Sequence, residues 1–243
     1  MPAGLPSPDT PVPAAMREFA GGPVTLVWQN EVGGLTGRTG GPDPMHVKWD
    51  PAGSPESLAD ECERLTWLSA RHPAPEVVAL RRAADGDLLA TRSLPARSAV
   101  DPVWRARPAE ALRALGAGLR ALHDLPVRDC PWRWDVPTRV EAAAREGIRV
   151  PDPLRDAPEI DRLVVCHGDA CAPNTLIDDD GRFAGHVDVA RLGVADRWAD
   201  LAVVTLSLGW NYDAYDEGVF WEAYGVAPDA ERIAFYRALW DAT

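Results

Sequence analysis

Three oxygen-bearing side chains in the second half of the chain are of the types, and in the order, that one kind of chemistry requires. Asp169 follows an apolar run at residues 163–166, Asn174 comes five positions later, and Asp188 fourteen positions beyond that. In phosphoryl transfer an aspartate orients the attacking hydroxyl and accepts its proton, while an asparagine and a second aspartate hold Mg²⁺ on the nucleotide phosphates. The spacing of Asp169 and Asn174 also matches a kinase catalytic loop. These residues therefore predict a phosphoryl-transfer site.

The elements that must position these side chains are short strands. Residues 163–166 read as a buried strand, and residues 174–177 and 182–189 read as a strand pair joined by an Asp-Asp-Asp-Gly turn at 178–181. This arrangement predicts that all three side chains lie at the mouth of one small sheet. We expect His167 to be a hydrogen-bonded scaffold residue rather than a base. The alternative is structural: His167 and Asp169 cap a turn, and Asp188 is a solvated strand end.

The N-terminal part offers a second set of phosphate ligands. A strand at residues 23–30 leads into a glycine-rich turn at 32–41 that includes Gly33 and Gly34, and another strand brings Lys48. A strand, a glycine-rich turn and a strand bearing lysine are how a kinase places backbone N–H groups and an ammonium on nucleotide phosphates. A P-loop is excluded, because its first glycine falls on Val32 and its lysine on Arg38.

A helix predicted near residues 57–70 provides a partner for Lys48. Glu61 lies thirteen positions after Lys48, on the apolar side of the helix formed by Leu58, Leu65 and Leu68. A Lys48–Glu61 pair would hold the ammonium extended toward a nucleotide instead of letting it reach water. The alternative is that Glu61 is an exposed helix acid, since Asp60 and Glu63 flank it.

The other elements complete a two-part plan. Residues 1–13 contain five prolines and predict a loose tail or an arm on the surface. Two strands are predicted at residues 76–81 and 87–93, joined at 84–86. A long helix at 108–122 and a second helix at 138–146 follow. Leucines at four positions form one face of the long helix: Leu112, Leu115, Leu119 and Leu122.

Composition limits the partners. The chain of 243 residues carries 25 basic and 37 acidic residues, a formal charge of -12, which disfavours nucleic acid and suits a polycation. Its four cysteines show no disulfide framework, so we expect a reduced, cytoplasmic setting. No apolar run reaches the ~20 residues of a membrane span, and the start lacks a signal-peptide pattern. Membrane insertion and secretion are therefore disfavoured.

A family resemblance rests on the same residues. The segment at 164–201 reads VVCHGDACAPNTLIDDDGRFAGHVDVARLGVADRWADL and resembles the core of the aminoglycoside phosphotransferase family, particularly its 3'-phosphotransferase (kanamycin kinase) branch. Residues 232–239 share the likeness, and the N-terminal half shares it more weakly. The resemblance implies an α+β, two-lobed protein-kinase-like fold, with a small antiparallel-sheet nucleotide-binding lobe at residues 14–94. A mainly helical catalytic and substrate-binding lobe would occupy 95–243.

The resemblance also implies an activity and cofactors. It predicts an ATP-dependent (or GTP-dependent) enzyme that uses Mg²⁺ and phosphorylates a hydroxyl, at the 3' position, of a cationic aminoglycoside, conferring antibiotic resistance. Glu61 matches the helix glutamate of the family. Arg191 matches an arginine placed near the transferred phosphate, and residues 91–94 match the segment that contacts adenine. Asp156 and Glu159, in a shortened interval at 147–161, face either the substrate ammonium groups or solvent.

The chain departs from the family at two places that concern the substrate. Leu206 and Ser207 stand where close relatives have an Arg-Asp pair, and the acidic, Phe-terminated end of the family is replaced by residues 240–243, in which Asp241 could still bind an ammonium group. Two other functions stay open for this reason. One is a kinase of another small alcohol, such as a sugar, choline or a macrolide, and the other is a catalytically silent nucleotide-binding relative.

Overall fold

The computed structural model describes residues 4–83 and 85–243, and its contacts divide the chain into two units. The first comprises the described residues up to Ala70 and those between Ala74 and Leu94, and the second comprises Arg71–Pro73 and Pro95–Thr243. Residues 1–3 of the predicted tail and Ala84 of the predicted turn lie outside the described residues. That the units act as nucleotide-binding and catalytic lobes stays a prediction.

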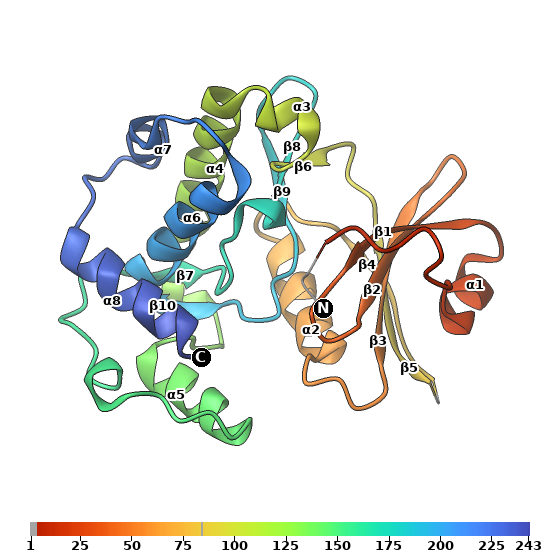
Figure 1. The fold of residues 1–243 in the computed structure, drawn as a ribbon, viewed down its shortest axis with the longest axis horizontal. Helices are drawn as coiled ribbons and strands as arrows, with labels where there is room; N and C mark the ends of the chain where they lie inside the picture. The colour runs from red at the N-terminus through yellow and green to blue at the C-terminus, as the bar shows by residue number, and fades with distance from the viewer. Residues whose placement is uncertain (1–3, 84) are drawn as a thin grey trace. The chain divides into compact units, whose positions relative to one another are not determined.

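The first unit is built on a five-stranded antiparallel sheet in the order β1-β2-β3-β5-β4 (Figure 1). Its strands are β1 (Val24–Gln29), β2 (Leu35–Thr39), β3 (Met45–Pro51), β4 (Val77–Ala83) and β5 (Gly86–Arg92). Helix α2 (Leu58–Ser69) packs against β4 and β5. Ser57 caps α2 by accepting the Asp60 N–H, and the predicted face of Leu58, Leu65 and Leu68 is buried.

The sequence pattern missed strand β2, because the glycine-rich stretch at 32–41 suggested a turn throughout. Only residues 30–34 form the turn between β1 and β2. Leu35, Gly37 and Thr39 are buried and alternate with more exposed residues, the signature of a strand with one covered face. The short length of β2, with a glycine at its centre, hid this alternation.

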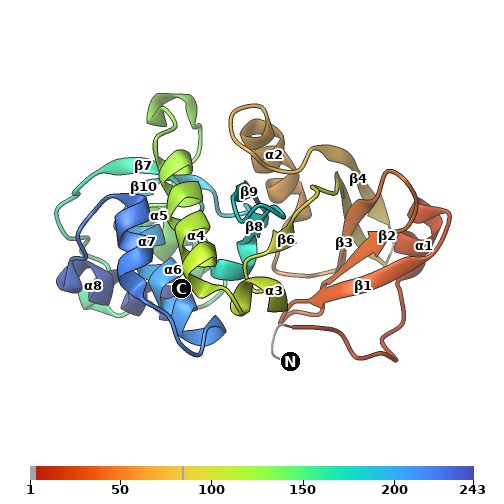
Figure 2. The ribbon, with the colours of Figure 1, turned by 90° about the horizontal axis from the view of Figure 1, so that it is seen from above.

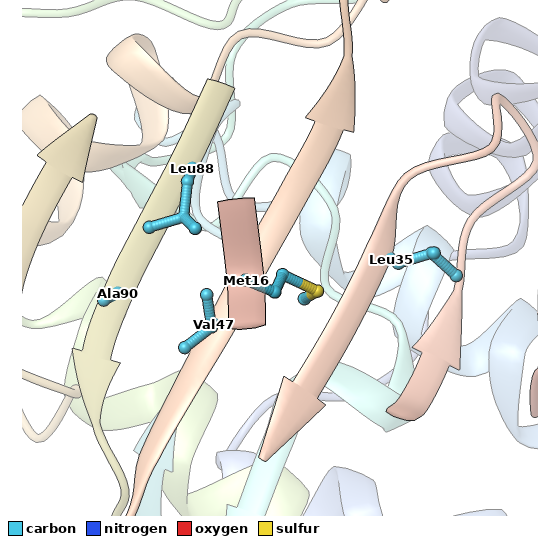
Figure 3. Close-up of a cluster of buried hydrophobic side chains, with 5 residues drawn as sticks. All are labelled: Met16, Leu35, Val47, Leu88 and Ala90. Atoms are coloured by element: carbon cyan, nitrogen blue, oxygen red, sulfur yellow. The ribbon is translucent and has the colours of Figure 1, made fainter. Parts of the chain in front are cut away.

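A short helix, α1 (Ala14–Ala20), covers one part of the sheet and was also not predicted. Its Met16 is fully buried in a cluster with Leu35, Val47, Leu88 and Ala90 (Figure 3). Seven residues are too few to show a helical period, so packing decides this helix. The described part of the predicted tail lies along the sheet as an arm, since Gly4 exchanges backbone hydrogen bonds with Gln29.

The second unit is mainly helical. Its helices are α3 (Pro102–Arg105), α4 (Pro108–His123), α5 (Val136–Arg145), α6 (Trp198–Asn211), α7 (Glu217–Tyr224) and α8 (Ala230–Asp241), with 3-10 turns η1 (Val127–Asp129), η2 (Asp152–Leu154) and η3 (Ala172–Asn174). Helix α4 packs against α7, and α6 against α8 (Figures 1 and 2). The predicted leucine face of α4 is buried, as is His123 at its end.

The strands of this unit correct the prediction of a single small sheet. Strand β7 (Leu163–Cys166) pairs with β10 (Gly193–Asp196), a strand that was not predicted. A separate sheet joins β6 (Arg97–Ser98), β8 (Thr175–Ile177) and β9 (Phe183–His186). The predicted strand at 182–189 ends early, because the chain turns at Asp188, which has a positive φ of 62°. The site residues therefore lie on loops between two sheets.

Candidate active site

The loop from His167 to Asn174 follows the buried strand β7 and is held from helix α6. The carboxylate of Asp200 accepts the backbone N–H groups of His167 at 2.6 Å and Gly168 at 3.0 Å. Gly168 has φ +86°, and a Cβ there would lie 2.2 Å from the Arg191 carbonyl oxygen, so the chain passes too closely for any side chain. A buried acid and an obligatory glycine thus set the start of this loop.

His167 is a scaffold residue in this structure, as predicted. Its Nδ1 lies 3.3 Å from the Asp169 N–H, which donates to it, and its Nε2 lies 3.0 Å from the Val187 carbonyl oxygen. Nδ1 accepts a hydrogen bond and Nε2 faces a carbonyl oxygen. The ring is therefore the neutral tautomer with its proton on Nε2. The ring is fully buried and links the loop to the segment before Asp188.

Asp169 and Asn174 are in direct contact. The Asn174 Nδ2 donates to the backbone oxygen of Asp169 at 2.9 Å and to its Oδ2 at 3.3 Å. Oδ1 of Asp169 is buried and has no hydrogen-bond partner among the described residues. Because Asn174 uses its amide nitrogen here, its amide oxygen is the atom left to bind a cation. The contact therefore fixes the Asp169 carboxylate against the Asn174 amide.

Asp188 joins this pair through the backbone. The Val187 N–H donates to the Asn174 carbonyl oxygen at 3.0 Å, which places Asp188 directly after a residue bonded to Asn174. Its left-handed backbone is uncommon outside glycine, although aspartate tolerates it, and such conformations concentrate at functional sites. The structure therefore brings the segments of Asp169, Asn174 and Asp188 together within one unit. Their roles as proton acceptor and Mg²⁺ ligands stay predictions.

Ser207 is a site residue that the sequence showed only as a departure from the family. Its Oγ accepts the backbone N–H of Ala172 at 2.9 Å, and the Asn211 Nδ2 donates to both its carbonyl oxygen (2.8 Å) and its Oγ (3.1 Å). Ser207 is fully buried. It lies two helical turns after Asp200, so one face of α6 holds the loop at two points. Only the fold reveals this role.

The thiol of Cys171 lies inside this loop and stays protonated. Burial, followed by the charge of Asp169, raises the pKa of Cys171 far above its ordinary value. A thiol that does not ionise is a poor nucleophile and a poor metal ligand. Oxygen ligands are accordingly the relevant ones at this loop.

One cluster of other potential metal ligands occurs among the described residues, and its atoms are already engaged. His123, Cys166 and Asp200 bring their ligand atoms within 4.8 Å of one another. The His123 Nε2 bonds Asp200 at 3.0 Å, its Nδ1 bonds the Tyr224 hydroxyl at 2.8 Å, and burial raises the pKa of Cys166 well above its ordinary value. This cluster is a hydrogen-bonded brace beneath the loop.

Arg191 lies beside the loop through its backbone, while its side chain is exposed. Its guanidinium is 5.9 Å from the ring centroid of Trp134, and Arg139 approaches the same ring at the same distance. Burial, and then the charge of Arg191, lowers the pKa of Arg139 to about 10. The predicted role of Arg191 beside a transferred phosphate stays a prediction.

In the first unit, Lys48 and Glu61 form the predicted pair. The Lys48 Nζ lies 2.7 Å from Oε1 and 2.8 Å from Oε2 of Glu61, and the Glu61 side chain is 5% exposed against 25% for Lys48. A charge-assisted contact to both oxygens holds the lysine extended on β3. Glu61 is therefore a buried partner and not an exposed helix acid.

Gly33 and Gly34 lie in the tight turn between β1 and β2. Asn30 closes this turn: its N–H donates to the Gly34 carbonyl at 3.0 Å, and its side-chain oxygen accepts the Gly34 N–H. A Cβ at Gly34 would lie 2.2 Å from Asp50 Oδ1, so a larger residue there would displace that side chain. That this turn contacts nucleotide phosphates stays a prediction.

The three acids expected to bind substrate lie at the surface. Asp156 and Glu159 are exposed in the segment between η2 and β7, and the Glu159 carbonyl oxygen accepts Arg232 Nη1. Asp241 is exposed as the last residue of α8. Their predicted role toward a cation is compatible with this exposure and stays a prediction.

These features define a phosphotransferase of the kinase-like class, and comparison with known proteins places the chain within it. The model of the phosphotransferase enzyme family matches residues 35–236, and the chain belongs to that family. The predicted family and enzyme class are therefore confirmed.

The relatives identify the branch that the chain resembles. An aminoglycoside 3'-phosphotransferase of Streptomyces fradiae is 36% identical over 83% of this chain and 87% of the relative. The streptomycin 3''-kinase of Streptomyces griseus is 32% identical over 79% and 82%. The solved structure of a type VIII aminoglycoside 3'-phosphotransferase matches with a TM-score of 0.77 and 29% identity over 94% of this chain and 98% of that one. The predicted kinase-like fold is confirmed.

Proposed function

We propose that this protein is an ATP-dependent O-phosphotransferase that phosphorylates the 3'-hydroxyl of an aminoglycoside and thereby confers resistance. The observation that carries the proposal is the contact of Asn174 with Asp169, in a loop that Asp200 and Ser207 hold. Support comes from the relatives named as aminoglycoside 3'-phosphotransferases and from a solved relative, aminoglycoside phosphotransferase APH(3'')-Id from Streptomyces rimosus, described in complex with ADP and streptomycin. That structure matches with a TM-score of 0.69 and 27% identity.

In this proposal Asp169 performs the proton chemistry. Its carboxylate orients the acceptor hydroxyl and takes its proton, while Asn174 holds the carboxylate through Oδ2. General base catalysis of this kind contributes roughly 10² to 10⁴ in rate. Arg191 offsets negative charge that develops on the transferred group, and Asp156, Glu159 and Asp241 attract the ammonium groups of the substrate.

The residues of the candidate site include suitable ligands for Mg²⁺ and for nucleotide phosphates. The amide oxygen of Asn174 and the carboxylate of Asp188 are the hard oxygen ligands that Mg²⁺ prefers, and the protonated Cys171 does not compete. Bound Mg²⁺ would neutralise charge on the nucleotide phosphates. In the first unit, Lys48, oriented by Glu61, would bind nucleotide phosphates, and the N–H groups of the Gly33–Gly34 turn would cover phosphates. A supply of ATP implies action in the cytoplasm.

Residues 4–83 and 85–243 contain no helix with the length and apolar character needed to cross a bilayer.

ADP release in the presence of kanamycin, neomycin, streptomycin or hygromycin tests the proposal. We expect turnover with ATP, Mg²⁺ and kanamycin, a phosphate on the 3' position of the product by NMR, and loss of turnover in Asp169→Ala. GTP run in parallel measures the nucleotide preference. Bacteria that express the wild-type protein, and not Asp169→Ala, should survive higher kanamycin concentrations. Equal turnover by Asp169→Ala would remove Asp169 from its role.

A further inference from the structure

One large aromatic side chain on helix α6 is exposed to solvent. Of the ten tryptophans, Trp210 is the most exposed, at 56%. It lies in the last turn of α6, and its ring centroid is 5.5 Å from that of Trp240 in the last turn of α8, with the planes inclined at 46°. Packing within the chain covers only part of this indole. The two rings together form an aromatic surface, which we call the Trp210–Trp240 pair.

The position of the pair follows from the face of α6 that holds the catalytic loop. Asp200 accepts N–H groups at the start of the loop, and Ser207 accepts the Ala172 N–H near its end. Trp210 comes three residues after Ser207, which in an α-helix is about 4.5 Å along the axis and about 60° around it. The exposed indole therefore lies on the helix that anchors the end of the loop carrying Asp169, about one turn beyond the anchoring residue. The proposed acceptor binds at this loop, so the pair is a candidate contact for it.

The charge around the pair suits a cation. From Leu206 to Glu231 the chain has no lysine or arginine, while Asp213 and Asp241 are exposed. The nearby Arg237 is turned into the protein, where its guanidinium donates to the Ala202 carbonyl oxygen and to Thr205 Oγ1. An indole face attracts ammonium groups through its quadrupole, and tryptophan is the best side chain for this contact.

We propose that Trp210, backed by Trp240, binds a protonated amine of the acceptor by a cation–π contact and helps to determine acceptor specificity. The inference rests on the proposed function, because it places the acceptor at Asp169. In this inference, two neutral aromatic rings bind the ammonium group in place of carboxylates. When a carboxylate binds an ammonium group, both charges lose water, and this desolvation costs free energy. An aromatic face binds the ammonium group without a carboxylate that must be desolvated.

Two substitutions at one position test the charge recognition. A cation–π contact of about 0.5 to 2 kcal/mol corresponds to roughly a 2- to 30-fold change in affinity. We expect Trp210→Leu to raise KM for kanamycin by that factor, with KM for ATP and kcat little changed, and Trp210→Phe to keep much of the affinity because it keeps an aromatic face. Trp28→Leu, at a 37% exposed tryptophan on β1, is the matched control.

A binding experiment separates this inference from the proposed function. Calorimetric titration of kanamycin into Asp169→Ala, with and without Trp210→Leu, measures the Kd for kanamycin in the absence of turnover. A weaker Kd in the double variant supports the Trp210 contact. An unchanged Kd, or equal losses in Trp210→Leu and Trp210→Phe, overturns it. Absence of turnover by the wild-type protein with every aminoglycoside tested would instead contradict the proposed function, while the titration still decides whether Trp210 binds the amine.

Discussion

The hydroxyl of Ser207 accepts the backbone N–H of Ala172 at 2.9 Å, and this bond fastens the end of the loop at residues 167–174 to helix α6. Asp200, two turns earlier on the same face, fastens its start through His167 and Gly168. One helix therefore fixes both ends of the loop that contains Asp169. Because a helix face is rigid, the distance between these two anchors is set by α6 and not by the loop.

We expect Ser207→Ala to lower both stability and kcat. Removing the hydroxyl leaves the buried Ala172 N–H unpaired, at a cost of about 1–3 kcal/mol in the free energy of unfolding. Urea unfolding and steady-state kinetics measure the two effects. Ser207→Thr, which keeps a hydroxyl, should restore much of kcat. If Ser207→Ala unfolds earlier yet keeps the wild-type kcat, the hydroxyl stabilises the fold without positioning the loop.

Asp169→Asn should lose roughly 10² to 10⁴ in kcat, because an amide occupies the space of the carboxylate but accepts no proton. KM for ATP should change little, and thermal unfolding should stay close to wild type. Asp180→Asn, in the exposed turn between β8 and β9, serves as the control acid and should keep full activity. Comparable kcat values for Asp169→Asn and wild type would contradict the assigned role.

Glu61→Gln should raise KM for ATP and lower kcat by about tenfold or more. The amide cannot neutralise the Lys48 ammonium, which is then free to turn toward water. The matched control is Glu63→Gln, two residues along the same helix, where the side chain is exposed. Kinetics with varied ATP compare the two, and similar values for both variants would show that the Lys48–Glu61 pair has no part in nucleotide use.

Gly168→Ala should be both destabilised and inactive. A Cβ would meet the Arg191 carbonyl oxygen, and the φ of +86° itself costs about 1–3 kcal/mol for a non-glycine residue. Gly147→Ala isolates the conformational part, because Gly147 has a φ of +78° and a Cβ added there would have open space for 4 Å around it. We expect Gly147→Ala to lose stability alone. Retained activity in Gly168→Ala would show that the loop tolerates displacement.

Stability should fall between pH 6.5 and about pH 4 because of His72. Burial lowers the pKa of His72 to about 4, and its Nε2 lies 3.0 Å from His186 Nδ1. The unfolded chain, with a histidine pKa of about 6.5, binds more protons in this interval, so stability is complete above it and is lost as pH falls. The change corresponds to up to about 3 kcal/mol.

His72→Gln tests this pH dependence. Its free energy of unfolding should vary less between pH 6.5 and pH 4 than that of the wild type. Burial also lowers the pKa of His186, so the slope should shrink and not vanish. An unchanged slope in urea titrations at several pH values would assign the acid sensitivity to other groups.

The sequence by itself determined the family, the class of chemistry and the Lys48–Glu61 pair, because these depend on residue types at fixed spacing. Asp169 and Asn174 lie five positions apart on one loop, and a helical period places Glu61 on the covered face of α2. Spacing within one loop or one helix is set by the sequence and does not depend on how distant segments pack. They missed β2 and α1, since elements of five and seven residues carry too little periodicity.

Only the tertiary structure decided which distant groups hold the loop and which stay exposed. The anchors at Ser207 and Asp200, the division of the strands into two sheets, and the pairing of Trp210 with Trp240 join residues that lie far apart in the sequence. Such contacts depend on how helices and strands pack, because packing and not spacing brings those side chains within hydrogen-bond or ring-contact distance.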